Sequence, residues 1–250
     1  MLRNRLITVL TFNNGTLFRT KVFEPDYRYT HNFVDSWSVD EIVMLDVTRD
    51  PGADKSAFYE VVTQFAKECF VPLAVGGGIR TLDDAKKMMA VGGDKVVVNS
   101  GAVERPELIT EIAEAYGSQC VVLSIDARKS DNLDGGYEAF SHCAARPIGK
   151  TPDAWAREGE SLGAGEIMIT SVERDGSLQG YDIELCRRVT DAVTVPVLGM
   201  AGAGNWKHFV EGVEKGGLSA VCTQNIYHFT ETSIASAKKF MEKKGIPVRL

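Results

Sequence analysis

The sequence lacks the features that would assign it to a class at once. Its five cysteines are scattered and odd in number, and none forms a Cys-x-x-Cys pair, which argues against a disulfide framework or a zinc site. There is no HExxH motif and no His/Cys cluster, so we expect no metal and no other cofactor. No apolar run is long enough to span a membrane, and the apolar N-terminus has no signal-peptide cleavage pattern. These absences predict a cytoplasmic protein.

A strong excess of one charge is also missing. The chain has 28 Lys and Arg against 34 Asp and Glu, a net charge of −6, and no long basic run, so we expect no nucleic-acid partner. Hydrophobic content of 44% and charged content of 25% are typical of a soluble globule. No linker or low-complexity segment divides the 250 residues. We therefore predict a single domain over residues 1–250.

Glycine is concentrated at two places that match each other. Gly76–Gly78 follow an apolar run and precede a helix signal and the polar pair Asn99-Ser100. The same order returns in the second half, where Gly202 stands 124 residues after Gly78. A strand–glycine–helix unit that repeats at half the chain length indicates a duplicated half.

Short apolar runs alternate with helical patterns along the whole chain. Strands are predicted at 5–12, 41–47, 71–75, 95–99, 120–126, 166–170, 195–199 and 219–223. Helices are predicted between them, at 54–68, 106–116, 152–162, 182–192, 205–215 and 231–244, with a weaker one near 31–36. This pattern predicts an α/β fold, a (β/α)8 TIM barrel built from two similar half-barrels. A doubly wound sheet is the alternative, and the half-length repeat favours the barrel.

Two longer segments, 13–29 and 128–150, are predicted to be loops that act as lids over a ligand at the C-terminal face. At the same face, glycine turns let backbone N–H groups approach a phosphate. Gly78, Asn99 and Ser100 form the first predicted phosphate site. The equivalent positions of the second half are Asp175, Gly176, Gly202, Gln224 and Asn225. The alternative is that these turns only connect strands to helices.

Two carboxylates end predicted strands. Asp126 ends the fifth strand and is a candidate acid–base group, although it could also only order neighbouring loops. Asp46 ends the second strand and could bind a hydroxyl or order a loop. The histidines His142, His208 and His228 are isolated and are interpreted as hydrogen-bonded structural residues.

Four charged residues stand at strand starts, and a barrel would bring them together at its N-terminal mouth. They are Arg5, Glu41, Lys95 and Glu166. Charges at that end normally serve stability or solvation. Two basic and two acidic residues could also close a salt-bridged gate.

The sequence resembles the cyclase subunit family of imidazole glycerol phosphate synthase, from histidine biosynthesis. The resemblance covers nearly the whole chain, including DEIVMLDV, PLAVGGGIRTLDDA, GGDKVVVNS and GAGEIMITSVERDGSLQGYD. It implies a (β/α)8 barrel with a glutaminase partner on the N-terminal face. Ammonia from that partner would pass through the barrel to a phosphorylated small-molecule ligand at the C-terminal face.

The resemblance also assigns residue roles. It makes the four strand-start charges an ammonia gate, places Asp94 at the glutaminase interface and makes Asp126 catalytic. Three departures lie on the substrate side. Thr11 stands where the family has an essential aspartate, and a threonine hydroxyl does not exchange a proton near pH 7 as a carboxylate does. Arg19 replaces the family's loop lysine. In the second phosphate site, Ala201, Gln224 and Asn225 replace small residues.

The retained gate and the lost aspartate favour a diverged branch of this family. Such a barrel would carry ammonia for amidation of a sugar in lipopolysaccharide or O-antigen biosynthesis, with a sugar amidotransferase on the C-terminal face as a further partner. The alternative is an active cyclase/lyase that makes imidazole glycerol phosphate and aminoimidazole carboxamide ribotide. A phosphoribosyl isomerase fits less well, because it needs a strand-one aspartate and no gate. A purely structural barrel is the last alternative.

Overall fold

The computed structural model describes residues 3–21, 24–26, 39–50, 52–68, 70–224 and 234–249. Eight parallel strands form a closed barrel, because β10 pairs with β11 on one side and with β7 on the other. In order around the barrel they are β1 (Arg5–Asn13), β4 (Glu41–Asp46), β5 (Leu73–Gly76), β6 (Lys95–Val98), β7 (Val121–Lys129), β10 (Glu166–Ser171), β11 (Val197–Met200) and β12 (Ala220–Thr223). This closure confirms the predicted (β/α)8 barrel and excludes the doubly wound sheet.

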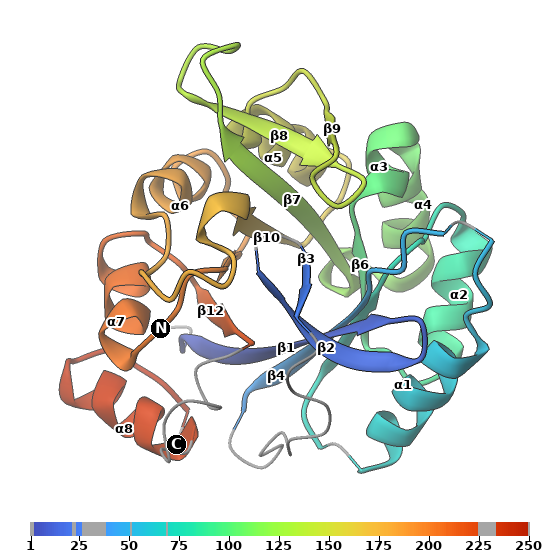
Figure 1. The fold of residues 1–250 in the computed structure, drawn as a ribbon, viewed down its shortest axis with the longest axis horizontal. Coiled ribbons are helices and arrows are strands. Elements are labelled where there is room, and N and C mark those ends of the chain that lie inside the picture. Colours follow the sequence, from blue (N-terminus) through green and yellow to red (C-terminus); the bar gives the residue numbers. More distant parts are fainter. Residues whose placement is uncertain are drawn as a thin grey trace.

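Helices surround the barrel (Figure 1). They are α1 (Ser56–Glu68), α2 (Leu82–Ala90), α3 (Ser100–Glu104), α4 (Glu107–Tyr116), α5 (Pro152–Ser161), α6 (Ile183–Thr190), α7 (Trp206–Glu214) and α8 (Ile234–Lys243), with short 3₁₀ turns η1 (Ser118–Cys120) and η2 (Val172–Arg174). At α2 a capping box is present, since Thr81 Oγ1 accepts from Asp84 N and Asp84 accepts from Thr81 N. Among the described helices, none combines the length and the apolar character needed to cross a membrane. The weaker helix predicted at 31–36 lies outside the described residues.

The two segments predicted as loops contain strands, which corrects the prediction. Segment 128–150 extends β7 to Lys129 and returns as β8 (Tyr137–Ser141) and β9 (Arg146–Pro147), both antiparallel. In segment 13–29, β2 (Thr16–Lys21) folds back on β1 and pairs with β3 (Glu24–Asp26). The Gly135-Gly136 turn lets β7 return as a hairpin, because both glycines have a positive φ that other residues rarely adopt.

The barrel strands alternate between two apolar layers. Side chains that face the axis form an inner cluster that includes Ile7, Val9, Val43, Val97 and Val122. The intervening residues pack outward against the helices in a larger cluster. This alternation decides which polar residues at the strand ends also face the axis, and so it positions the candidate site.

Candidate functional site

Four charged side chains meet at the N-terminal mouth, each from the first residue of a strand. Arg5 contacts Glu41 at 2.6 Å through Nη1 and Glu166 at 2.8 Å through Nη2. Lys95 Nζ lies 3.0 Å from Glu41 and 2.8 Å from Glu166. Each cation therefore contacts both carboxylates, and the four form a closed ring across the axis. We call this set the N-terminal ring.

Burial and charge pairing oppose each other in the N-terminal ring. Glu41 is only 1% exposed, and burial raises its pKa although Lys95 and Arg5 act to lower it. For Arg5, burial acts to lower the pKa, but the two carboxylates together outweigh it and the pKa is raised. A buried ion-pair ring of this kind gives geometric specificity more than net stability.

Asp94 lies next to the N-terminal ring and is exposed. Its carboxylate accepts a hydrogen bond from Leu73 N at 2.8 Å, which links the starts of β5 and β6. The side chain is thus fixed at the N-terminal face. Its assignment to a partner interface stays a prediction.

The layer of the axis directly above the N-terminal ring is apolar. Ile7, Val43, Ala74 and Val97 belong to one buried inner cluster. Any polar solute that passes along the axis loses hydrogen bonds there, which favours a small neutral molecule over an ion.

The C-terminal end of the axis carries Asp126. Its carboxylate Oδ2 accepts a hydrogen bond from Asn99 Nδ2 at 3.0 Å. Burial raises the pKa of Asp126 to about 7, opposed by the Asn99 hydrogen bond and, more weakly, by Arg128, and reinforced by Asp175. An acid with a pKa near neutrality can donate or accept a proton at physiological pH.

Thr11 faces the axis at the same end. It follows Ile7 and Val9 at two-residue intervals on β1, and both of these belong to the inner cluster. Thr11 is 2% exposed. Among the described strand residues that face the axis at this end, Asp126 on β7 is thus a titratable carboxylate, whereas β1 carries the hydroxyl of Thr11.

The first predicted phosphate site is partly occupied by a side chain that the sequence did not reveal. Lys55, just before α1, donates from Nζ to Gly77 O at 2.8 Å, and a Cβ at Gly78 would overlap its ammonium group. Ser100 Oγ accepts from His142 N at 2.9 Å, so its own O–H remains to donate elsewhere. Lys55 thus adds a cation to the turn at Gly78, next to β6 and its Asn99-Ser100 end.

Asp46 has a local role. Its Oδ1 accepts from Thr48 N at 3.0 Å, and it lies opposite the outward-facing Phe12 in the register of β1 and β4. This bond fits the loop-ordering alternative for Asp46, and the binding of a hydroxyl by Asp46 stays a prediction.

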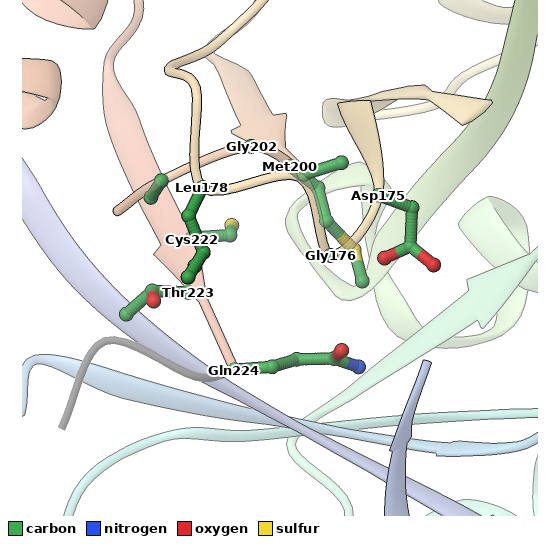
Figure 2. A pocket seen from close by; sticks show the side chains of 10 residues that line it. Asp175, Gly176, Leu178, Met200, Gly202, Cys222, Thr223 and Gln224 are labelled. Atoms are coloured by element: carbon green, nitrogen blue, oxygen red, sulfur yellow. The ribbon is translucent and has the colours of Figure 1, made fainter. Parts of the chain in front are cut away.

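The second predicted phosphate site forms a pocket between the ends of β10, β11 and β12 (Figure 2). Asp175, Gly176, Gly202 and Gln224 all line it, and Figure 2 shows the Gln224 amide extending toward the Asp175 side. Its apolar lining includes Met200, and also Leu178 and Cys222, which the sequence did not single out. A Cβ at Gly202 would overlap Gly180 O, so this glycine is needed for loop packing.

Some predicted positions receive no side-chain description. Arg19 lies in β2, where its backbone is opposite Asp26, and its side chain is outside the described part. Asn225 and His228 lie outside the described residues. His208 is hydrogen-bonded as expected, since Gly204 N donates to its Nδ1 at 3.0 Å. Among the described residues, no group of three or more His, Cys, Asp or Glu could hold a metal ion.

A comparison with protein-family models gives one match, over residues 8–233, to the family described as histidine biosynthesis protein. The matched region starts within β1 and covers the other seven barrel strands. It includes Asp126, Thr11 and both glycine turns. With its closed (β/α)8 barrel, the chain belongs to the histidine biosynthesis protein family.

Proposed function

We propose that this barrel accepts ammonia from a glutaminase bound at its N-terminal face and passes it along the axis to the C-terminal mouth. The N-terminal ring carries this proposal: Arg5, Glu41, Lys95 and Glu166 form a closed set of ion pairs over an apolar axis. A ring of ion pairs excludes water and ions at rest. Displacement of the Lys95 side chain would open a path wide enough for a small neutral molecule.

The acceptor of the ammonia, in this proposal, is a sugar carboxyl or acyl group of lipopolysaccharide or O-antigen biosynthesis. The presence of Thr11 supports this assignment of the ammonia acceptor. Without a second carboxylate, the upper mouth has one proton-exchanging residue, Asp126, among the described inner-facing strand ends. Ring cyclisation of the histidine-pathway type needs proton exchange on both sides of the substrate, whereas delivery of ammonia does not.

The second candidate is the active cyclase of histidine biosynthesis. The near-neutral pKa of Asp126 favours it, because a single carboxyl group poised at about 7 can act as an acid in one step and as a base in the next. Turnover of the histidine-pathway substrate with ammonium salt separates the two candidates.

The partner half is tested with a purified glutaminase subunit from the same genome. We expect the full-length barrel to stimulate glutamine hydrolysis. Reversal of charge in Asp94→Lys should weaken the complex, because this exposed carboxylate is fixed beside the N-terminal ring and charged rims steer association. Asp83→Lys is the matched control, since Asp83 is exposed in the first turn of α2, at the opposite end of the barrel. Glutaminase activity that is unchanged by the barrel, or equal effects of both variants, would contradict the proposal.

A further inference from the structure

Arg128 lies two residues beyond Asp126 on β7. In the antiparallel register of β7 and β8, Asp126 is opposite Phe140 and Arg128 is opposite Glu138. Side chains alternate along a strand, and directly opposite residues share a face. These four side chains therefore lie on one face of the hairpin.

That face continues the inner side of the barrel. Asp126 follows the inner-cluster residue Val122 at an even spacing along β7. The intervening residue Ala127 and its β8 neighbours Tyr137 and Ala139 belong to the outer cluster instead. Arg128 is thus carried above the C-terminal mouth, on the Asp126 side.

The Arg128 guanidinium has an aromatic neighbour but forms no ion pair within 4.0 Å with a carboxylate among the residues that the structure describes. Its Cζ lies 5.3 Å from the centroid of the Phe140 ring. Its Nε is buried and makes no hydrogen bond among the described residues. Stacking on a ring face uses the plane of the guanidinium and leaves its N–H edge available.

The carboxylate opposite Arg128 is engaged elsewhere. Glu138 is buried and accepts from Ser130 Oγ at 3.1 Å and from Asn132 Nδ2 at 3.4 Å, both on the hairpin connection. These bonds hold Glu138 toward the tip of the hairpin. The positive charge of Arg128 is consequently left to act on the mouth, where it stabilises the ionised form of Asp126.

We infer that Arg128 is a binding residue for an oxyanion of the ligand that enters the C-terminal mouth. A planar guanidinium with a free N–H edge matches the two oxygens of a carboxylate. Arg128 is half-buried, and its buried Nε, which has no hydrogen-bond partner among the described residues, gains from such a ligand. This inference rests on the proposed function and narrows it: the acceptor is an acidic sugar, whose carboxylate Arg128 holds beside Asp126. A sugar phosphate offers the same oxyanion chemistry and is separated by the test.

The test is calorimetric titration of the full-length protein with D-glucuronate, D-glucose 6-phosphate and neutral D-glucose. We expect glucuronate to bind more tightly than glucose. Arg128→Gln should weaken glucuronate binding by about tenfold or more, the usual scale for a lost charged hydrogen bond, and should leave glucose binding unchanged. Arg128→Lys should recover only part of the affinity, because lysine keeps the charge without the planar fork.

Lys129→Gln is the matched control. Lys129 is the next residue on β7, is exposed and lies over the Tyr137 ring on the other face of the hairpin, so glucuronate affinity should change by less than about twofold. Thermal unfolding of each variant verifies that the barrel is folded.

Wild-type protein that binds glucuronate no more tightly than glucose would overturn the inference, as would equal losses in Arg128→Gln and Lys129→Gln. A preference for glucose 6-phosphate that depends on Arg128 would keep the oxyanion site and overturn the sugar-acid assignment. The two proposals fail separately. Glutaminase stimulation without Arg128-dependent binding removes only this inference, whereas Arg128-dependent binding without stimulation removes the ammonia path.

Discussion

The two ends of the barrel differ in how their charges are paired. At the N-terminal end, Arg5 and Lys95 each contact both carboxylates of the ring, so the set is complete within the chain. At the C-terminal end, Asp126 has one amide partner, and Arg128 stacks on an aromatic ring. The lower end therefore needs no ligand to satisfy its charges. At the upper end, the buried Arg128 Nε and Asn99 Oδ1 have no hydrogen-bond partner among the described residues.

This difference separates a conduit from a site of chemistry. In the proposed function, the self-paired ring is a closure that opens when one side chain moves, and it requires no bound molecule. An end with a near-neutral carboxyl group and a guanidinium that forms no ion pair among the described residues is suited to binding. The comparison predicts that substitutions in the N-terminal ring change stability most, while substitutions at the C-terminal mouth change pH dependence and binding.

The largest expected effect is on stability, from Lys95→Met. This variant leaves two buried carboxylates, Glu41 and Glu166, which are 1% and 8% exposed, with Arg5 as the one remaining cation of the ring. Loss of one partner of a buried ion pair costs about 3–5 kcal/mol, which urea unfolding would measure. Lys86→Met is the control, because the Lys86–Asp83 pair is on the surface and should change stability by less than about 0.5 kcal/mol. Similarly small changes in the unfolding free energy of both variants would contradict the proposed difference between the two ends.

The next largest effect is on the pH dependence of the unfolding free energy, from Asp126→Asn. The pKa of Asp126 is raised to about 7 by burial, so the native state keeps this proton at a pH where the unfolded state has lost it. The stabilising contribution is therefore full below about pH 4 and is lost as the pH rises toward 7. Asp126→Asn should remove a decline in unfolding free energy of roughly 2–4 kcal/mol between these limits.

Ser124→Ala provides the control for that pH series. Ser124 is buried two residues before Asp126 on the same strand and carries no ionisable group, so its variant should keep the decline. An unchanged decline in Asp126→Asn would show that other groups produce it.

The smallest expected effect is a difference in stability between alanine variants at the two glycine turns of the C-terminal end. Gly202→Ala places a Cβ against the backbone oxygen of Gly180, whereas at Gly78 the obstacle is the flexible end of Lys55. Both residues have positive φ, so both substitutions carry a strain of about 1–2 kcal/mol. Only Gly202→Ala adds a backbone clash, and it should be the less stable variant by about 1–2 kcal/mol. Gly136→Ala, which has positive φ but open surroundings, measures the strain alone in the same thermal unfolding series. Equal losses at Gly78 and Gly202 would refute the packing role of Gly202.

The barrel and the N-terminal ring could be predicted from the sequence because both follow from strand periodicity. Short apolar runs mark the strands, and a charge at a strand start must lie at the N-terminal face. The sequence does not predict the hairpin in 128–150, because glycine and aspartate dominate the segment before its second strand. That strand, Tyr137–Ser141, does follow a glycine turn, as a hairpin strand does.

The remaining parts of the site depend on contacts between residues distant in sequence. Lys55 reaches the turn at Gly78 from the start of α1, and no local sequence pattern predicts this contact. Whether Arg128 pairs with Glu138 depends on which other groups donate hydrogen bonds to the Glu138 carboxylate. Sequence can place such residues on a strand, but their partners become clear only in three dimensions.

The most direct test of the proposed division between the two ends is turnover of the histidine-pathway substrate with ammonium salt. We expect negligible cyclised product from the wild-type protein, because Thr11 cannot exchange a proton near pH 7. We expect a measurable gain from Thr11→Asp, which restores a carboxylate facing the axis at the Asp126 end. Wild-type turnover that exceeds or equals that of Thr11→Asp would contradict the proposed division.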